Sequence, residues 1–254
     1  MGERHIVVTG AGSGIGRAIA LRLAADGVAV SLVGRRREPL AATAVDIGGR
    51  MAIVPCDIRD REAVDQALGA AAEQLGPFHG LVAASGIGGP NGGDDEGGDR
   101  FEDLVATNLT GTYHCVRAVL RHLAQGPNER HVVVISSILA RIAVPGYTGY
   151  SASKAGLLGL VRSLAAELGS ENVMVNAICP GWVDTDMAWQ GLDAIAAGSG
   201  GTRESAYEEA MRAVPLGRMA RPEDVAGTVA WLLSDDARGI TGQAIDQNGG
   251  AWMA

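Results

Sequence analysis

Two side chains four residues apart carry the strongest chemical signal in this sequence. Tyr150 and Lys154 lie in the run 149–156, which opens an apolar helical stretch. Side chains at positions i and i+4 of a helix share one face, so a phenol and an ammonium would lie side by side. The ammonium would favour phenolate and lower the tyrosine pKa from its usual value of about 10, so that the phenol could exchange a proton with an alcohol oxygen near neutral pH. For such a pair standing alone, a surface tyrosine beside a solvated lysine is the alternative.

A glycine-rich turn near the N-terminus is the second signal. A short strand ends at Thr9, and before the next helical pattern comes the run Gly10-Ala11-Gly12-Ser13-Gly14-Ile15-Gly16. Glycine lets the backbone approach a ligand closely, and a helix N-terminus offers N–H groups and partial positive charge to a pyrophosphate. The spacing differs from the common G-x-G-x-x-G pattern. Its position at the first strand–helix junction nevertheless favours dinucleotide binding over a purely structural turn.

Short β-branched runs alternate with helical patterns over the whole chain, which is typical of a parallel sheet covered on both faces. We expect a single-domain (residues 1–254) Rossmann-type α/β fold, a doubly wound sheet of seven parallel strands. The predicted strands are 5–9, 28–33, 51–55, 80–84, 131–136, 173–178 and 243–246. The predicted helices are 14–25, 61–75, 100–123, 150–168 and 222–233. Right-handed crossovers would place the site at the carboxyl ends of the strands.

Two segments interrupt this alternation. Residues 85–99 contain seven glycines and follow the fourth predicted strand, and residues 184–218 follow the sixth. Both leave carboxyl ends of strands, so both should border the site. The second segment offers Met187, Trp189, Leu192 and Ile195 as apolar surface, and we interpret it as a substrate lid. A helical insertion packed on the core is the alternative.

Composition and charge narrow the class of protein. The chain has 254 residues, of which 47% are hydrophobic, and a net charge of -8. These values suit one sizeable core and argue against nucleic acid as a partner. Cys56, Cys115 and Cys179 are widely spaced, so we expect buried free thiols of a reducing compartment. We recognise no signal peptide and no run long enough to span a bilayer, and expect a cytoplasmic protein without a membrane partner or a metal site.

Several ordered motifs resemble those of the short-chain dehydrogenase/reductase family over nearly the whole chain. Besides the glycine turn, Asn108 lies in Ala106-Thr107-Asn108-Leu109-Thr110-Gly111, and Ser137 lies thirteen positions before Tyr150. The spacing Tyr150-x-x-x-Lys154 matches the family's active-site pair, and the run 176–185 matches its Pro-Gly segment. The resemblance implies an NAD(P)-dependent oxidoreductase that transfers hydride between a nicotinamide and a ketone or secondary alcohol.

The resemblance also implies a role for each of four catalytic residues. Tyr150 would be the general acid in reduction and the base in oxidation, while Lys154 would lower its pKa and hold the nicotinamide ribose. Ser137 would stabilise charge on the substrate oxygen, or else cap the strand end, for which Ser136 is the better candidate. Asn108 would hold a water that relays protons from Lys154, or else bond its own helix backbone.

The cofactor-binding residues follow from the same resemblance. They are Gly10, Ser13, Gly14, Ile15, Gly16, Arg35, Arg36, Asp57, Ile58, Ala83, Gly86, Tyr150, Lys154, Pro180, Gly181, Val183 and Thr185. Asp57 would contact the adenine or else cap the next helix, and Thr185 would bind the carboxamide and could cap a helix as well. The run Ala83-Ala84-Ser85-Gly86 departs from the family's Asn-Asn-Ala-Gly. Gly86 should keep the backbone path, whereas the asparagine hydrogen bonds are lost.

The end of the second predicted strand bears on the choice of cofactor. NAD-specific relatives place an acid near Gly34 to accept from the ribose 2′-hydroxyl, and this chain has none there. Arg35, assisted by Arg36, could bind a 2′-phosphate. NADP(H) is therefore favoured. NAD(H) is the alternative, because Ser13 stands where some NADP-specific relatives have a basic residue.

Segments near the expected site resemble aromatic polyketide ketoreductases and 3-oxoacyl carrier-protein reductases. The expected substrate-binding residues are Ser137, Leu139, Tyr147, Tyr150, Trp182, Met187 and Trp189. For at least one tryptophan, core packing under the lid is the alternative. We predict a bulky or cyclic, polyketide-like ketone. The alternatives are a 3-oxoacyl thioester, NAD-dependent oxidation of a secondary alcohol, and a dinucleotide-sensing regulator without turnover, which the retained Tyr150 and Lys154 disfavour.

The resemblance also predicts assembly. Long helices such as those expected over 100–123 and 150–168 often pair between subunits in the family, so we expect a homotetramer. Trp252 and Met253 give the C-terminus an apolar end that would pack against a neighbouring subunit.

Overall fold

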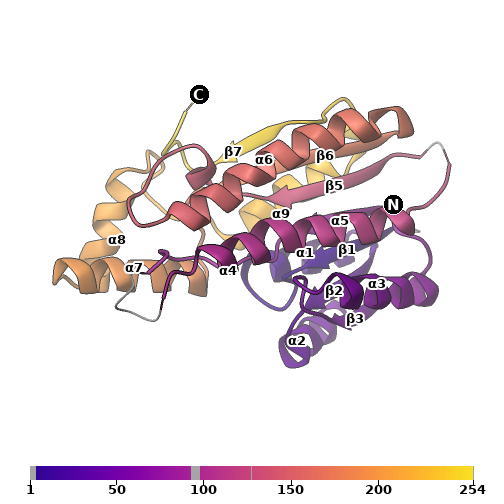
Figure 1. Cartoon of the computed structure of the whole chain (residues 1–254), viewed down its shortest axis with the longest axis horizontal. Coiled ribbons are helices and arrows are strands. Elements are labelled where there is room, and N and C mark those ends of the chain that lie inside the picture. Colours follow the sequence, from indigo (N-terminus) through magenta and orange to yellow (C-terminus); the bar gives the residue numbers. More distant parts are fainter. Residues whose placement is uncertain (1–3, 93–97, 127, 254) are drawn as a thin grey trace.

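Seven parallel strands form one sheet (Figure 1). The structure, a computed structural model, describes residues 4–92, 98–126 and 128–253. The strands are β1 (His5–Thr9), β2 (Ala29–Gly34), β3 (Met51–Pro55), β4 (Gly80–Ala83), β5 (Arg130–Ile135), β6 (Val173–Pro180) and β7 (Ala244–Gln247). Their order is β3-β2-β1-β4-β5-β6-β7, and every neighbouring pair is parallel. The predicted doubly wound, seven-stranded parallel sheet is confirmed.

The order of the strands locates the binding crevice. From β1 the chain continues outward to β2 and β3, whereas β4 to β7 extend the sheet in the other direction. The connections that follow β1 and β4 therefore separate at the carboxyl edge and open a crevice between them. The glycine turn follows β1 and the run 84–86 follows β4, so the two predicted cofactor segments meet at this point.

Helices cover both faces of the sheet. Those of one face are α1 (Gly14–Ala25), α2 (Arg37–Ile47) and α9 (Pro222–Leu232), and those of the other are α3 (Arg61–Leu75), α5 (Gly111–Arg121) and α6 (Thr148–Leu168). In β1, Ile6 and Val8 pack in the core under α1, α2 and α9, and Val7 packs in the core under α3, α5 and α6, because side chains alternate along a strand. All five residues of β1 are buried, as expected for a strand with neither face in solvent.

The region around Asn108 differs from the prediction. The single helix expected over 100–123 is instead α4 (Phe101–Val105), a π-helical turn (Ala106–Thr110) and α5. Asn108 lies within the π-helical turn and is only 1% exposed. Such turns interrupt α-helices most often at functional sites. Nothing in the hydrophobic period of the sequence indicates this interruption, because a single turn changes the period too briefly.

The segment 184–218 forms two helices, α7 (Asp186–Ser199) and α8 (Arg203–Arg212), and is called the α7–α8 insertion below. The helices pack on each other around Leu192 and Met211, in a small core separate from the two cores of the sheet. Figure 1 shows both helices at one end of the molecule, beyond the strands. At the base of the insertion, Ala220 donates from its N–H to Trp182 O (2.9 Å), and Asp184 donates to Ala220 O (2.9 Å).

Three short 3-10 turns complete the described secondary structure, at Ile138–Ala140, Gly169–Glu171 and Asp235–Ala237. The three cysteines are buried and free, as predicted. Among the helices that the structure describes, none is both long enough and apolar enough to cross a membrane.

Candidate active site

A pocket of about 260 Å³ lies at the carboxyl edge of β1, β2, β3 and β4. The glycine turn forms its floor because side chains do not fit there. Gly10 has a φ of +70°, and a Cβ on it would lie 2.9 Å from Ala84 O. A Cβ on Gly16 would overlap the carbonyl of Gly10. At the start of α1, the N-cap Ser13 makes no side-chain capping hydrogen bond, so the helix N–H groups remain for a ligand.

Much of the predicted cofactor set lines this pocket. The predicted residues found there are Gly10, Ser13, Gly14, Ile15, Gly16, Arg35, Arg36, Asp57, Ile58, Gly86 and Thr185. Ala83, Tyr150, Lys154, Pro180, Gly181 and Val183 lie outside the lining. Ala83 is the last residue of β4 and is buried at 2% exposure, so Ala84 and Ser85 face the pocket instead. Val183 is also buried, where it bridges to Ala220.

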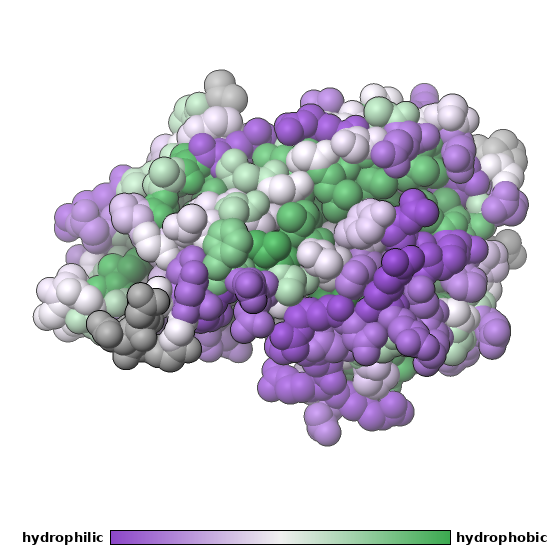
Figure 2. All heavy atoms as spheres, viewed as in Figure 1, coloured by the Kyte–Doolittle hydropathy of each residue, from purple (hydrophilic) through white to green (hydrophobic). Residues whose placement is uncertain are grey.

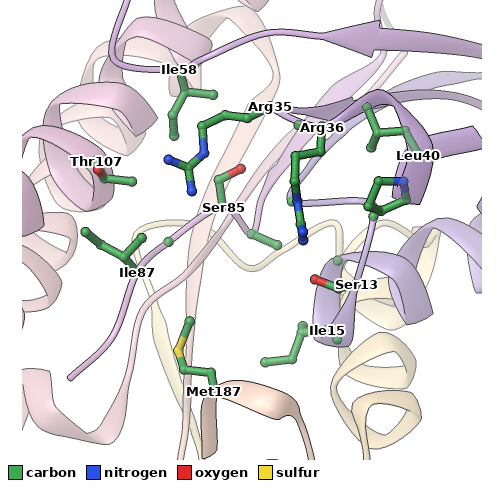
Figure 3. A pocket seen from close by; sticks show the side chains of 18 of the residues that line it. Ser13, Ile15, Arg35, Arg36, Leu40, Ile58, Ser85, Ile87, Thr107 and Met187 are labelled. Atoms are coloured by element: carbon green, nitrogen blue, oxygen red, sulfur yellow. The ribbon is translucent and has the colours of Figure 1, made fainter. Parts of the chain in front are cut away.

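Two arginines reach into the pocket from the end of β2 (Figure 3). Arg35 extends toward Ile58 and Thr107, and Arg36 extends toward Ser13 at the start of α1. Neither guanidinium has a hydrogen-bond or ion-pair partner among the described residues. Arg36 therefore brings positive charge to the position where Ser13 itself supplies none.

The end of the pocket where Asp57 lies contains an ion pair that sequence reasoning missed. Arg59 donates from Nη2 to Asp57 Oδ2 (2.8 Å) and from Nε to Asp57 Oδ1 (3.2 Å). This hydrogen-bonded pairing, opposed by burial, holds the pKa of Asp57 below its ordinary value. The alternative that Asp57 caps the next helix is wrong, because Asp60 accepts from Ala63 N and caps α3. Arg59 could have been suspected from its position two residues after the acid.

The backbone after β4 is held without the family's asparagines. The hydroxyl of Thr9 accepts from Ala84 N (3.1 Å) and Ser85 N (3.0 Å). Further along, Asn108 accepts from Ile87 N (2.9 Å) and donates to Ile87 O (3.0 Å). Thr9 and Asn108 thus take over the fixation of this segment.

Asn108 connects three segments of the site. Besides Ile87, its Nδ2 donates to Ser153 Oγ on α6 at 3.0 Å. Its side chain does not bond its own helix, so the alternative of local backbone bonding is not what the structure shows. A Cβ on Gly86 would lie 3.1 Å from Asn108 Oδ1 and 3.5 Å from Lys154 Nζ. Gly86 therefore lets Asn108 and Lys154 approach the same stretch of backbone.

Tyr150 and Lys154 share one face of α6, as predicted. Lys154 is 5% exposed, its Nζ lies 5.7 Å from the centroid of the Tyr150 ring, and it donates to Ile135 O at 2.9 Å. Burial lowers the pKa of Lys154 to about 8. The Ser137 hydroxyl accepts from Leu139 N at 3.1 Å, and its interaction with Tyr150 opposes the rise of the pKa of that phenol.

The expectation that Lys154 lowers the tyrosine pKa is wrong for this arrangement. Burial raises the pKa of Tyr150 above its ordinary value, the hydrogen bond with Ser137 opposes this rise, and nearby Tyr147 adds to it. Tyr150 consequently keeps its proton near neutral pH, which is the acid form of the phenol.

Ser136 and Thr185 have structural partners. The hydroxyl of Ser136 donates to Lys154 O at 2.9 Å and so joins the end of β5 to α6. Thr185 caps α7 by accepting from Ala188 N at 3.4 Å. Helix capping was one of the two roles predicted for this residue.

The structure divides the predicted substrate residues into two groups. Leu139 and Tyr147 lie beside the Ser137–Tyr150 pair, and the rings of Tyr147 and Tyr150 meet edge to face with centroids 6.5 Å apart. Met187 lines the pocket and contacts the segment after β4, because a Cβ on Gly88 would lie 2.8 Å from its Sδ.

Trp182 and Trp189 form the second group, which packs within the α7–α8 insertion. The Trp189 ring stacks on Tyr207 with centroids 5.8 Å apart, and its Nε1 donates to Asp184 Oδ1 at 2.7 Å. Core packing under the lid, the predicted alternative to substrate contact for at least one tryptophan, is therefore what the structure shows for Trp189. At the C-terminus, Trp252 packs under the guanidinium of Arg141 of the same chain, 5.2 Å from the ring centroid.

Comparisons with known proteins define the class. The chain belongs to the short-chain dehydrogenase/reductase family of NAD(P)-dependent oxidoreductases. A family model described as enoyl-(acyl carrier protein) reductase matches residues 10–251. The short-chain reductase protein NovJ of Streptomyces niveus is 38% identical over 251 residues, covering 98% of this chain and 94% of the relative. The 3-oxoacyl-[acyl-carrier-protein] reductase MabA of Mycobacterium tuberculosis is 34% identical over 252 residues, covering 99% and 94%.

Solved structures agree with this assignment. A variant of actinorhodin polyketide ketoreductase with NADPH superimposes with a TM-score of 0.91 at 32% identity, covering 98% of this chain and 97% of that one. Levodione reductase superimposes with a TM-score of 0.90 at 30% identity, again covering 98% and 97%.

Proposed function

We propose that this chain is an NADPH-dependent ketoreductase in which Tyr150 protonates the carbonyl oxygen. The observation that carries the proposal is the position of Tyr150 on α6 beside the buried Lys154, whose Nζ lies 5.7 Å from the centroid of the phenol ring. A phenol that keeps its proton is the form that carbonyl reduction needs. Ser137 follows β5 and Tyr150 lies on α6, at the carboxyl edge of the sheet where the cofactor pocket also opens.

The pocket fits a nicotinamide dinucleotide phosphate. The glycine turn leaves room for the backbone to contact a pyrophosphate, and the uncapped N-terminus of α1 offers N–H groups to it. The two unpartnered guanidinium groups, Arg35 and Arg36, suit a 2′-phosphate dianion, which forms charge-assisted hydrogen bonds with arginine. The related ketoreductase structure contains NADPH.

In the proposed reaction the bound cofactor supplies a hydride to the carbonyl carbon. Ser137 donates a hydrogen bond to the carbonyl oxygen and stabilises the charge that develops there. Tyr150 transfers its proton to the same oxygen, which completes the alcohol. Lys154 lies beneath the phenol, with its Nζ 5.7 Å from the ring centroid, and would hold the nicotinamide ribose. Asn108 fixes the backbone of Ile87 and holds Ser153 of α6, so both walls of the site keep their positions.

The substrate class is proposed from the walls of the site. Leu139 and Tyr147 beside the catalytic pair, and Met187 opposite, offer apolar surface to a bulky or cyclic ketone. We propose that the α7–α8 insertion acts as the substrate lid. The 3-oxoacyl thioester is the second candidate, because MabA is 34% identical over nearly the full chain.

A screen of NADPH oxidation tests reaction and substrate together. The panel contains bicyclic aromatic ketones, cyclohexanones and short linear 3-oxoacyl thioesters, and Tyr150→Phe serves as the inactive control. We expect turnover of the cyclic ketones that Tyr150→Phe abolishes. Activity on the linear thioesters alone would replace the proposed substrate class by the second candidate.

Cofactor choice is tested by comparing kcat/KM for NADPH and NADH. We expect a preference for NADPH that Arg35→Ala reduces by about tenfold or more, because one charge-assisted contact is worth about 1.5–3 kcal/mol. Equal values for the two cofactors, or a preference for NADH that Arg35→Ala leaves unchanged, would contradict the proposal.

We also propose a homotetramer in the cytoplasm. Figure 2 shows apolar side chains gathered over α5 and α6, the helices expected to pair between subunits. Phe101 of α4 and Tyr113 of α5 are 37% and 44% exposed. Three free thiols fit a reducing compartment. Light scattering of the purified protein tests the tetramer, and fractionation of the native host's cells tests the location.

A further inference from the structure

Asn91 lies in the segment between β4 and α4 and uses all four of its hydrogen-bonding positions. Its backbone N–H donates to Gly146 O (2.8 Å), and its backbone carbonyl accepts from Arg100 N (2.9 Å). Its Oδ1 accepts from Gly149 N at 2.7 Å, and its Nδ2 donates to Asp99 Oδ1 at 3.0 Å. A partly buried loop residue with this many fixed contacts connects segments that are distant in sequence.

The bond to Gly149 acts on the helix that carries Tyr150. The first N–H groups of any α-helix lack partners within the helix, and a side chain normally caps them. The N-cap of α6, Tyr147, makes no side-chain capping hydrogen bond. Asn91 supplies one from 58 positions away in the sequence, at the residue directly before Tyr150. The start of α6 is therefore fixed by the loop rather than by its own sequence.

Packing leaves this part of α6 little freedom. A Cβ on Gly149 would lie 3.0 Å from Phe101 Cα and 3.1 Å from Leu104 Cδ1, both on α4. Asp99 belongs to the same contact, because its Oδ1 also accepts from Phe101 N at 2.9 Å. Asn91 and Asp99 together fasten the beginning of α4 to the beginning of α6.

The other end of the contact reaches the proposed substrate site. Arg100, which donates to Asn91 O, also donates from its guanidinium to Pro90 O (3.1 Å) and Gly88 O (3.2 Å). Gly88 in turn lies against Met187 of the α7–α8 insertion. The loop that faces the substrate and the helix that carries the acid are thus joined at Asn91.

We propose that Asn91 is a positioning residue that fixes Tyr150 relative to the substrate loop and thereby determines which face of the ketone is reduced. The inference rests on the proposed reductase function. A displacement of about 1 Å between acid and substrate is enough to cost about 100-fold in rate. The glycine turn and Arg35 do not touch Asn91, so cofactor binding should be independent of it.

The first experiment is Asn91→Ala, which removes both side-chain contacts. We expect kcat to fall by about tenfold to 100-fold, KM for NADPH to stay within about twofold, and the enantiomeric excess of the alcohol to decrease. A residue that only stabilised the fold would lower the melting temperature without changing stereochemistry per turnover. Gln74→Ala, an exposed change on α3, is the matched control and should leave all of these values unchanged.

The second experiment exchanges the two partners without changing their size. Asn91→Asp keeps an acceptor for Gly149 N but places its carboxylate against Asp99, so we expect it to be impaired. In the double variant Asn91→Asp with Asp99→Asn, an amide again faces a carboxylate. The new carboxylate at position 91 can still accept from Gly149 N, and the new amide oxygen at position 99 can still accept from Phe101 N. We expect the double variant to recover kcat and stereochemistry to within about threefold of the original protein, as coupled neighbours do.

Amide hydrogen exchange provides a readout that needs no turnover. Asn91→Ala should accelerate exchange at Gly149 and the first turn of α6, and the double variant should restore protection. Unchanged exchange, or an Asn91→Ala enzyme with full kcat and unchanged stereochemistry, would overturn the role of Asn91. An original protein that binds NADPH but reduces no ketone would instead refute the proposed function.

Discussion

The catalytic floor, formed by Asn108, Ser137, Tyr150 and Lys154, differs from the α7–α8 insertion in where its polar contacts lie. In the floor, Asn108, Ser137 and Lys154 are all less than 8% exposed and hydrogen-bonded to backbone groups. In the insertion, the ion pair Arg203–Asp193 has side chains that are 52% and 45% exposed. Removing one partner of a buried hydrogen bond costs the desolvation of the other, whereas exposed ion pairs contribute little. The proposed catalytic groups are thus held by buried hydrogen bonds, whereas the surface of the proposed lid can change at small cost.

Tyr150→Phe attacks the floor directly and should have the largest effect. Removing the phenolic hydroxyl abolishes proton transfer, so we expect kcat to fall by about 1,000-fold or more. NADPH affinity, measured by fluorescence titration, should change little because Tyr150 lies outside the pocket lining. A variant with more than a tenth of the original activity would show that another group supplies the proton.

Ser137→Ala should be next, with a decrease in kcat of about 100-fold, typical of losing one donor to a developing oxyanion. The loss of its hydrogen bond should also raise the pKa of Tyr150 further, which ultraviolet titration of the phenol can detect. Ser136→Ala is the control, because Ser136 bonds only the backbone of Lys154 among these groups. If both variants lose kcat equally, Ser137 has no special role.

Acidification should weaken the sheet before it weakens the insertion. Burial lowers the pKa of His131 to about 4 and also lowers that of His5, and residues 184–218 contain no histidine. Imidazoles of the unfolded chain bind a proton near pH 6.5, so between pH 6.5 and about 4 the unfolded state holds more protons than the folded state. The free energy of unfolding therefore decreases as the pH is lowered through this window. For His131 alone this amounts to about 3 kcal/mol at pH 4.

Urea unfolding at pH 7 and pH 4, combined with hydrogen exchange, measures this effect. The sheet amides should lose protection first, because His5 and His131, the two histidines whose pKa values burial lowers, lie on β1 and β5. Earlier loss of protection in α7 and α8 would contradict the comparison.

Arg203→Ala should have the smallest effect. It removes the ion pair with Asp193 and the contact 5.7 Å above the Trp189 ring, both at the surface. We expect an unchanged kcat and a melting temperature within calorimetric error of the original, since exposed pairs are screened by solvent. A clear decrease in either would mean that the insertion is coupled more tightly to the floor than its contacts indicate.

The sequence predicts best where one physical signal dominates. The strands 5–9 and 51–55 and the helices 14–25 and 61–75 have the predicted bounds, because short apolar runs and helical periods with clear turn signals at their ends leave no competing interpretation. Helix α2 was not predicted, since only Leu40, Thr43 and Ala44 are buried in it and so narrow a strip gives little period. The helices of the α7–α8 insertion were predicted only as a lid or a packed insertion.

At the site, spacing along the chain was sufficient for residues on one element and insufficient across elements. Tyr150 and Lys154 share a face of α6, as their spacing requires. Asn91 was missed, because nothing in a single sequence shows which distant backbone groups a loop side chain will meet, whereas Arg59 could have been suspected from its position two residues after Asp57. The direction of the tyrosine pKa was missed for a similar reason, since burial depends on the whole fold.

The paired backbone at the base of the α7–α8 insertion has a consequence for engineering. The backbone hydrogen bonds among Trp182, Asp184 and Ala220 hold the start and the end of the insertion side by side. The rest of the chain therefore meets the insertion at two fixed, adjacent points. The cost of closing a longer loop grows only slowly with its length. Whole segments of different length could therefore be exchanged between these positions without moving β6, which would let libraries of chimeric reductases share one chemistry and differ in the ketone they accept.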